Sequence, residues 1–207
     1  MIVTGISEMS KSRVKIEIDG ESAFVLYKGE LRVYGIKEGN TLSVEHYETI
    51  MQEVLPKRAK MRAMNLLKSR AYTRMQLLNK LTEGGYPEEL AKYAVDYVES
   101  FGYVNDEQYV RDFIDYNKER KTRQRMLADL ICKGISKQFF DQIFDEEVGE
   151  DRTDLERKQI KEWIRKKNFS PDEASMEDMR KMTTFLYRKG FSVDTIRSVL
   201  SLDITSI

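Results

Sequence analysis

The feature that most constrains this chain is an internal repeat anchored on three glycines. Three segments align on it, namely Leu77–Val98, Met126–Glu147 and Met182–Asp203. In each segment a leucine stands four residues before the glycine, and a large apolar residue follows the glycine directly. Glycine readily takes the left-handed conformation that ends many helices, so each segment predicts a helix, a turn and a second helix. The three glycines are Gly85, Gly134 and Gly190.

Another segment with apolar residues at helical spacing precedes each of these, which makes three helices per unit. These segments are Lys57–Arg70, Asp106–Arg120 and Leu155–Lys167. Units of this length usually share hydrophobic core with their neighbours. We therefore expect a mainly α-helical chain of three tandem three-helix repeats that forms an elongated, curved body. The expected limits of the repeats are 57–104, 105–150 and 151–207.

Residues 1–56 follow a different, β-rich pattern. Arg13–Ile18 alternates apolar and polar residues, as a half-buried strand does. The Asp19–Gly20 pair predicts a tight turn, after which Ser22–Tyr27 returns as a second strand. Leu31–Tyr34 is expected to add another strand. The sequence thus predicts a small α+β domain over residues 1–56, with a sheet of three or four strands.

A single helix is expected at the end of this small domain. Ser43 is placed to cap it, and apolar residues recur at helical spacing as far as Val54. Pro56 is expected to end it, because proline lacks the backbone N–H that a helix needs.

The centre of the chain joins two helices through a basic elbow. The first carries Tyr109 and Val110 on its apolar face, and Thr122 is placed to cap the second. Lys118–Arg125 between them contains five bases and one acid. The nearby tyrosines suit either of two roles, stacking on a ligand or packing as half-buried staples between helices; they are Tyr72, Tyr109 and Tyr116.

The net formal charge of zero hides strong segregation along the chain. Lys57–Lys80 holds eight bases and no acid, whereas Asp141–Glu156 holds eight acids and one base. Arg157–Lys167 then holds six bases and one acid. Such blocks suit a surface that meets a charged partner, although solvated helix faces can also cluster in this way.

The residue inventory argues against catalysis. One histidine and one cysteine leave no material for a catalytic triad or a histidine-rich metal site, and no phosphate-binding glycine loop occurs. We expect no enzyme activity, cofactor or metal. Cys132 and the methionines are expected to fill helical cores. No segment is apolar enough for a membrane span or a secretory signal, so we expect a cytoplasmic protein.

Several segments resemble the RecX family of bacterial recombination regulators. The run FGYVNDEQYV at Phe101–Val110 resembles the family's signature, as do the stretches at Leu66–Leu81 and Phe185–Phe191. The N-terminal part is similar to the extension of the longer members, in IDGESAF at Ile18–Phe24 and in the helix start at Leu42–Val44. Gln76 departs from the family, where an acid is usual, and the elbow is poorer in glycine.

The resemblance implies tandem three-helix repeats and RecA as the partner. Family members bind the RecA–single-stranded DNA filament in its groove and inhibit ATP hydrolysis, strand exchange and co-protease function. We therefore expect a non-catalytic inhibitor of RecA in recombination, DNA repair and the SOS response. The candidate RecA or DNA contacts are Arg58, Arg62, Arg70, Arg74, Tyr109, Arg111, Lys118, Arg120, Lys121, Arg123 and Arg125.

Two alternatives remain open from the sequence. The chain would act as a DNA-binding adaptor independent of RecA if its basic three-helix modules engage DNA alone. It would act as a helical scaffold for another protein if the charge blocks serve only solubility. We expect a monomer that binds the RecA filament, with contact to free RecA, single-stranded DNA or duplex DNA also possible.

Overall fold

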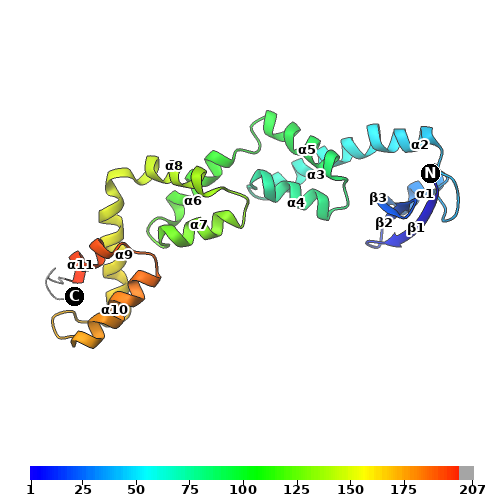
Figure 1. Cartoon of the computed structure of the whole chain (residues 1–207). Helices are drawn as coiled ribbons and strands as arrows, with labels where there is room; N and C mark the ends of the chain where they lie inside the picture. The colour runs from blue at the N-terminus through cyan, green and yellow to red at the C-terminus, as the bar shows by residue number, and fades with distance from the viewer. Residues whose placement is uncertain (201–207) are drawn as a thin grey trace. The chain divides into compact units, whose positions relative to one another are not determined.

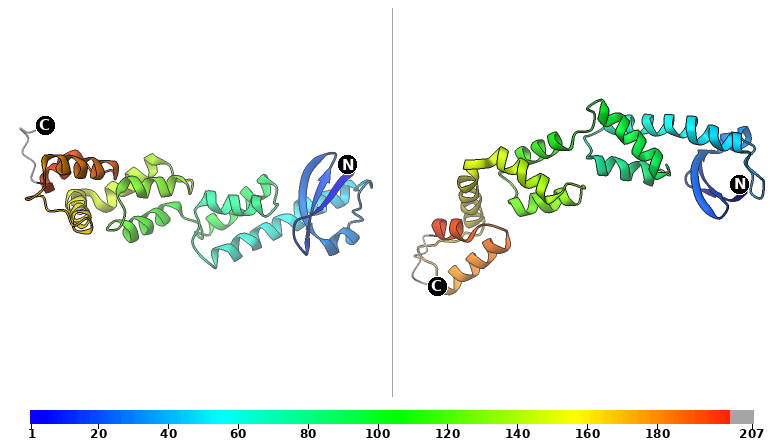
Figure 2. Two further views of the ribbon diagram at one scale, coloured as in Figure 1. Left: turned by 90° about the horizontal axis from the view of Figure 1, so that it is seen from below. Right: turned by 45° about the horizontal axis from the view of Figure 1, so that its top comes forward.

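A computed structural model describes residues 1–200 of the chain as two compact units (Figures 1 and 2). The first unit is Met1–Asn105, and the second begins at Asp106. The fold class predicted from the sequence is confirmed, because the chain is mainly helical with a small antiparallel sheet at its N-terminus.

The sheet has three antiparallel strands in the order β1–β2–β3. They are β1 (Val3–Glu8), β2 (Arg13–Ile18) and β3 (Glu21–Tyr27). The predicted strand at Arg13–Ile18 is confirmed, and its alternate residues Val14 and Ile16 are buried. The sequence reading had not singled out β1, which pairs with β2 through a register shift between Val3 and Gly5.

The prediction of a strand at Leu31–Tyr34 is wrong. This segment lies in and just after a short helix, α1 (Lys28–Val33). The Glu30 carboxylate explains the helix, because it accepts a hydrogen bond from the Tyr27 backbone N–H at 2.9 Å and so satisfies a free donor at the helix start. Leu31 then packs, partly buried, on the core of the sheet.

The prediction that Pro56 ends a helix is also wrong. Helix α2 (Val44–Thr49) passes through a π-helical turn at Ile50–Val54 into α3 (Leu55–Leu67) without a break. In this wider turn the Leu55 N–H donates to the Ile50 carbonyl, five residues back. The wider turn changes the hydrogen-bonding register just before Pro56, where a regular helix would need a donor that proline lacks.

Three helices follow the sheet in the first unit: α3, α4 (Arg74–Glu83) and α5 (Glu88–Ser100). Small residues of α3 and α5 allow the helices to approach closely, and leucines of α4 fill the remaining space. The fully buried members of this cluster are Ala59, Ala63, Leu77, Leu81, Ala91, Ala94, Val95 and Val98.

The second unit contains six α-helices within the described residues. Helices α6 (Asp106–Asn117), α7 (Arg123–Ile131) and α8 (Lys137–Val148) surround one hydrophobic cluster. A short 3-10 turn, Gly149–Asp151, leads into α9. The remaining helices surround a separate cluster and are α9 (Arg152–Lys166), α10 (Met176–Arg188) and α11 (Val193–Leu200).

The glycine repeat is confirmed at the level of single hydrogen bonds. Gly85, Gly134 and Gly190 have φ angles of 87°, 87° and 93°, in the left-handed region. The residue after each glycine donates its N–H to the carbonyl of the aligned leucine, at 3.2, 3.1 and 3.4 Å. These leucines are fully buried, so the same residue closes the turn and anchors the core. They are Leu81, Leu130 and Leu186.

Four hydrophobic clusters accompany the small sheet and the three groups of helices. They support our proposal of four domains, at 1–56, 57–104, 105–150 and 151–207. The continuous helical run across Pro56 couples the first two of these mechanically, because a helix transmits orientation between its ends.

Some expected core residues lie on the surface instead. Cys132, expected to be packed, is exposed because it stands at the end of α7, beyond the last buried turn. Tyr116 is exposed, whereas Tyr72 is buried and Tyr109 half-buried, so the staple role suits only the latter two. Met126 and Met182 are buried as expected, but three other methionines lie on the surface of the first unit: Met61, Met64 and Met75.

Candidate functional site

The basic elbow between α6 and α7 is a tight, internally bonded turn. Asn117 ends α6 with its side chain buried, and its amide donates to the Phe113 carbonyl at 2.7 Å. The Asn117 carbonyl accepts the N–H groups of Arg120 and Lys121 at 2.8 and 2.9 Å. Thr122 then caps α7 by accepting the Arg125 N–H at 3.3 Å. These hydrogen bonds therefore hold the backbone of the elbow in place.

Gln159 of α9 fastens the elbow to the third group of helices. Its side-chain amide donates to the carbonyls of Lys118 and Lys121 at 2.5 and 2.9 Å. Gln159 is only 9% exposed, so these bonds lie largely outside water. A neutral side chain makes this connection, and the cations around it therefore keep their charge for other contacts.

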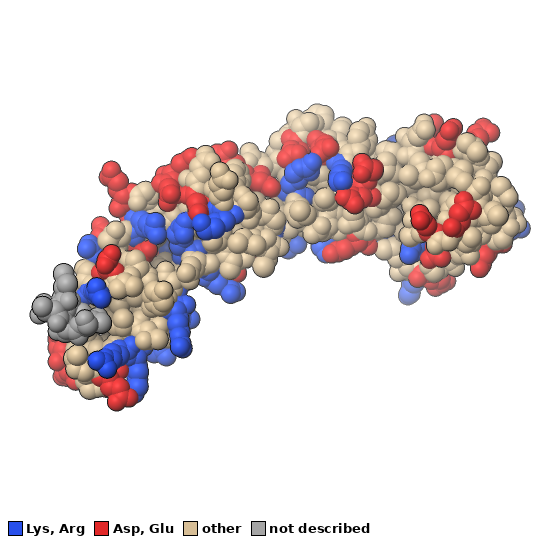
Figure 3. Space-filling view, viewed as in Figure 1, with Lys and Arg blue, Asp and Glu red and all other residues tan. Residues whose placement is uncertain are grey.

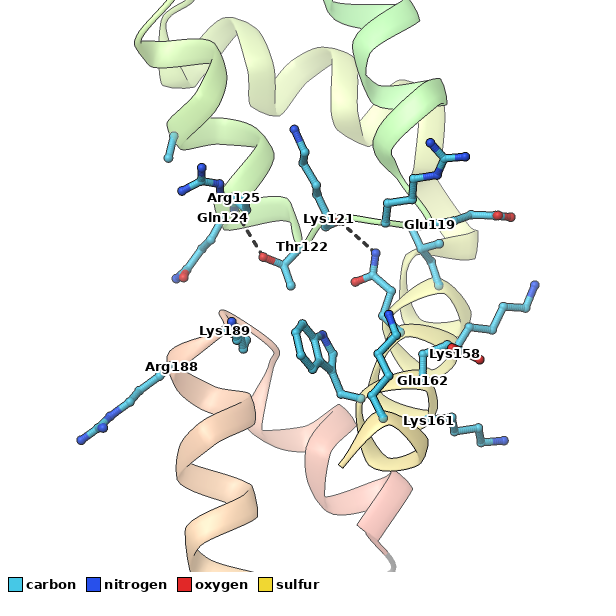
Figure 4. Close-up of a pocket in the computed structure, with 16 residues that line it drawn as sticks. Glu119, Lys121, Thr122, Gln124, Arg125, Lys158, Lys161, Glu162, Arg188 and Lys189 are labelled. Atoms are coloured by element: carbon cyan, nitrogen blue, oxygen red, sulfur yellow. Dashed lines mark hydrogen bonds between the residues drawn. The ribbon is translucent and has the colours of Figure 1, made fainter. Parts of the chain in front are cut away.

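A cleft of about 990 Å³ opens beside this connection, between α7, α9 and α10. Figure 4 shows side chains of the elbow and α7 facing side chains of α9, with Arg188 and Lys189 at the end of α10. We call it the basic cleft, since eight cations and only two carboxylates line it. The cations are Arg120, Lys121, Arg125, Lys158, Lys161, Lys166, Arg188 and Lys189.

Within the described part of the chain, most of these cations have no acidic partner. Lys121 and Arg125 share Asp129, at 2.8 and 3.2 Å. Among residues 1–200, the other six cations of the basic cleft form no salt bridge. Figure 3 shows Lys and Arg side chains gathered on the visible face of the second unit. Such a surface attracts polyanions, because each bound phosphate relieves repulsion between neighbouring cations.

An aromatic side chain forms part of the wall of the basic cleft. Trp163 of α9 is half-buried, and the Phe185 ring meets it edge-on at a centroid distance of 5.4 Å. Two lysines lie over the indole, Lys189 with its Nζ at 4.7 Å and Lys166 at 5.5 Å from the ring centroid. Cations around a fixed aromatic ring suit a ligand that combines phosphates with flat bases.

The elbow residues predicted from the sequence divide into two groups. Arg120, Lys121 and Arg125 line the basic cleft, and Lys118 lies beside it. A hydrogen bond to Asp115 raises the pKa of Lys118. Arg123 instead faces the domain interior.

The Arg123 side chain makes its contacts within the fold, with residues of α8. Its guanidinium meets the Asp141 carboxylate at 2.5 Å and lies over the rings of Phe140 and Phe144 at 5.6 and 5.5 Å. The side chain thus holds α7 against α8.

Arg111 and Tyr109 of α6 are also engaged within their own domain. Arg111 contacts the carboxylates of Glu107, Glu146 and Glu147 at 2.8, 2.6 and 2.5 Å. The hydrogen bond from Arg111 lowers the pKa of Glu146. Lys133 lies 5.7 Å from the Tyr109 ring centroid. Part of the acidic block of the sequence is therefore used to neutralise one arginine.

The candidate residues of the first unit lie apart from the cleft in sequence and are mostly paired. Arg58 forms a salt bridge with Glu30 and lies 4.9 Å from the Tyr27 ring centroid. Arg70 lies over the buried Tyr72 ring at 4.4 Å. Arg74 contacts two acids of α5, Asp96 and Glu99. Arg62 is exposed and lines a small depression beside the sheet.

The sequence reading missed the contribution of α9 and α10. It recognised a basic block at Arg157–Lys167 but did not connect that block with the elbow. The helical spacing of Lys158 and Lys161, with Gln159 on the inward side, was the available signal. Arg188 and Lys189 join the site only through the packing of α10, which sequence spacing does not reveal.

The fold and the site together define a class of protein, namely a helical repeat protein of three-helix domains with a cation-lined cleft. Family models for the first and third three-helix domains of RecX match residues 59–97 and 154–200. The chain is thus similar to the RecX family of regulatory proteins in its first and third groups of helices.

Relatives named "Regulatory protein RecX" match along nearly the whole chain. The one from Caldanaerobacter subterraneus is 29% identical over 98% of this chain and 100% of its own length. The one from Clostridium acetobutylicum is 25% identical over 92% of this chain and 89% of its own. These relatives carry the name of a regulatory protein.

Two solved structures share the fold. A crystal structure of regulatory protein RecX matches with a TM-score of 0.64 at 20% identity, covering 97% of this chain and 98% of that one. RecX from Lactobacillus salivarius matches with a TM-score of 0.61 at 16% identity, covering 72% and 96%. Within residues 1–200, the helices are too short or too polar to cross a membrane.

Proposed function

We propose that this protein is a non-catalytic inhibitor of RecA that binds the RecA–single-stranded DNA filament. In this role it restrains ATP hydrolysis, strand exchange and co-protease activity during recombination, DNA repair and the SOS response. We propose that it acts as a cytoplasmic monomer. Similarity to relatives named "Regulatory protein RecX" supports a regulatory role, and the basic cleft carries the argument for the filament.

The charge of the basic cleft suits the phosphates of a filament-bound strand. Its six cations without salt bridges among the described residues retain full charge for a ligand. A phosphodiester strand that enters the cleft releases its counterions, and this release supplies affinity without any sequence preference. A regulator that must act on filaments of any sequence needs such a contact.

Trp163 adds a reason to favour a single strand over a duplex. A base can stack on an aromatic ring only when it is free of its own base stack. Trp163 is half-buried in the cleft wall and edge-packed by Phe185, so its orientation is fixed before a ligand arrives. Preorganisation of this kind reduces the entropy lost on binding.

The same cleft also supports the second candidate, a DNA-binding adaptor that works without RecA. The two functions make different predictions for the RecA ATPase on single-stranded DNA. An inhibitor lowers ATP hydrolysis at concentrations where the DNA is already saturated with RecA. An adaptor lowers it only by competing for bare DNA, so excess RecA restores the activity.

The test removes four cations of the basic cleft together, in the variant Arg120→Ala, Lys158→Ala, Lys161→Ala and Lys166→Ala. We expect affinity for a filament on oligo-dT to fall on the order of a hundredfold at low salt. Each lost phosphate contact should also flatten the dependence of log K on log salt by about 0.7 on a single strand. Fluorescence anisotropy at several salt concentrations measures both effects.

A control variant removes the same amount of charge elsewhere. Lys28, Lys80, Lys137 and Lys181 are salt-bridged to Glu or Asp and lie outside the basic cleft. Their replacement by Ala should leave affinity and salt dependence close to wild type. Equal losses in both variants would show that binding responds only to net charge, and inhibition of RecA that survives in the cleft variant would refute the proposed site.

A further inference from the structure

A second exposed surface lies on α5 and the turn after it, and its chemistry differs from that of the basic cleft. Four large aromatic side chains form it. Tyr93, Tyr97, Phe101 and Tyr103 are 49%, 37%, 61% and 59% exposed. We call these four residues the aromatic stripe. Large apolar groups that are exposed together, rather than singly, commonly mark an interaction site.

The geometry of the backbone brings the four rings together. Tyr93, Tyr97 and Phe101 are four residues apart, so they follow one side of the helix. Gly102, with a φ of 73°, then turns the chain, and the Tyr103 N–H donates to the Val98 carbonyl at 3.1 Å. This turn places the Tyr103 ring roughly parallel to that of Phe101, at a centroid distance of 6.3 Å.

The stripe is a fixed surface, because its rings support one another. Tyr97 and Phe101 meet edge-on at 5.0 Å. Lys60 of α3 lies over Tyr93 and Tyr97, with its Nζ at 4.4 and 4.3 Å from the two centroids, and donates to the Tyr93 hydroxyl at 2.9 Å. The four rings stand outside the hydrophobic cluster of these helices, because they are neither among its buried residues nor among the partly buried ones packed against it.

Charge distinguishes the partner of the stripe from a nucleic acid. The same helix exposes four carboxylates: Glu88, Glu89, Asp96 and Glu99. The nearby cations are already engaged, Lys92 with the first two, Arg74 with the last two and Lys60 with the rings. Carboxylates outnumber cations here, whereas cations outnumber carboxylates fourfold in the basic cleft. A phosphodiester strand is therefore attracted to this surface far less than to the basic cleft.

We propose that the aromatic stripe docks a protein surface that is apolar at its centre and basic at its rim. Aromatic side chains that lose their remaining exposure supply much of the energy of protein interfaces, and the carboxylates beside them select a basic rim. This inference rests on the proposed function in one respect, that the protein supplying the surface is RecA. The regulator then holds its target through two contacts, the stripe on protein and the basic cleft on phosphate.

The test measures the binding of RecA and of DNA separately. The triple variant Tyr97→Ser, Phe101→Ser and Tyr103→Ser removes three rings that lie outside the core. We expect its affinity for RecA without DNA to fall at least tenfold, with affinity for oligo-dT unchanged. Tyr187→Ser is the matched control, because Tyr187 is 60% exposed on α10 and lies outside the stripe and the cleft lining.

Each outcome has a defined meaning. Wild-type protein that binds neither the RecA filament nor DNA-free RecA refutes the proposed function and, with it, this inference. Wild-type protein that binds the filament but not DNA-free RecA refutes only the inference. Wild-type protein that binds RecA as tightly as the triple variant does refutes only the inference. A loss of oligo-dT binding in the triple variant would make the stripe a base-stacking surface, and a dimer in sedimentation velocity that dissociates in the variant would assign it to a second copy; both overturn the proposal.

Discussion

Two junctions in the molecule, one in each unit, both place a glycine turn against a neighbouring element and carry basic side chains. They differ in whether these basic side chains are paired with acids. In the first unit, the glycine turn after α4 faces Val25 of the sheet. In the second unit, the glycine turn after α10 faces Gln124 of α7. Basic side chains surround both junctions. At the sheet junction they are used within the fold, whereas at the cleft junction most remain without an acid among the described residues.

The difference lies in what the basic side chains meet. At the sheet junction Arg58 finds Glu30, and Arg13 donates to the Gly84 carbonyl at 3.2 Å. At the cleft junction the neutral Gln159 makes the connection. An arginine paired with an acid stabilises a junction, but the acid cancels much of the attraction of the arginine for an anionic ligand. An uncharged side chain that connects two elements leaves the surrounding cations available to bind such a ligand. The number of basic residues at a junction therefore does not tell which of them bind a ligand.

The largest expected effect on stability comes from adding a side chain at the glycine turn of the sheet junction. Gly85 has a φ of 87°, and a Cβ there would collide with the Val25 side chain. Gly85→Ala should lower the free energy of unfolding by about 2–4 kcal/mol, from left-handed strain together with the collision. Urea denaturation followed by circular dichroism measures this. Gly39→Ala is the control, because its φ of 82° adds similar strain in open space, so a loss equal to that of Gly85→Ala would argue against close packing at the junction.

A smaller effect is expected at the bridge of the cleft junction. Gln159→Leu keeps the volume but removes both hydrogen bonds to the elbow carbonyls. The cost should be about 1–3 kcal/mol, because two partly buried acceptors lose their donor. Affinity for oligo-dT should also fall although no charge changes, since the two walls of the basic cleft lose their fixed spacing. Unchanged DNA affinity in a folded Gln159→Leu variant would show that the bridge does not position the cleft.

One alanine substitution at each junction sharpens the comparison, when stability and DNA binding are measured for both. Arg58→Ala should cost about 1–2 kcal/mol of stability, because a half-buried Glu30 loses its partner. Lys161→Ala should change stability by less than about 0.5 kcal/mol, as exposed residues without partners usually do. The order should reverse for binding to oligo-dT, where only Lys161→Ala weakens affinity. A DNA-binding defect in Arg58→Ala with normal stability would place the first junction in the binding surface.

The smallest effect concerns the pH dependence of one ion pair in the cleft wall. The hydrogen bond from Lys121 lowers the pKa of Asp129 below its ordinary value. The pair therefore stabilises the fold above the unfolded-state pKa of about 3.9 and loses this contribution as the pH falls through the lower folded-state pKa. In Lys121→Ala, NMR titration should show the Asp129 pKa moving up toward the ordinary value. No movement would mean that another group holds the carboxylate.

Much of the helical part of the fold follows from short-range rules. The aligned leucines and glycines specify each helix end, since Leu81 and Gly85 belong to one hydrogen-bonded turn. The caps at Thr73, Thr122 and Ser175 were also predictable, because each side chain bonds a backbone N–H within three residues. Such contacts are local, and local contacts can be read from spacing.

The errors arose where local hydrogen bonds, together with contacts to the core of the sheet, outweighed residue preference. Leu31–Tyr34 has strand-forming residues, but Glu30 caps a helix there and Leu31 completes the sheet core. Pro56 usually ends a helix, yet the π-helical turn before it lets the helix continue. Its neighbour Leu55 is fully buried in the cluster of the sheet, and that burial favours continuation.

The candidate site was predicted in part. Arg120, Lys121 and Arg125 do line one cleft, whereas Arg123 is engaged by an acid far away in sequence. Arg111 is engaged by Glu107, four residues before it, and by two distant acids. Spacing alone cannot separate these cases, because a basic residue in a helix has the same pattern whether its side chain meets water or a carboxylate.

Backbone preferences over a few residues specify the helices of the three repeats, their glycine turns and the order of the repeats. Only the tertiary structure decided which charges remain available. Gln159, Arg188 and the elbow come from three segments, and packing alone brings them to one cleft. An ion pair depends on the distance between two atoms, and for residues far apart in sequence the fold sets that distance.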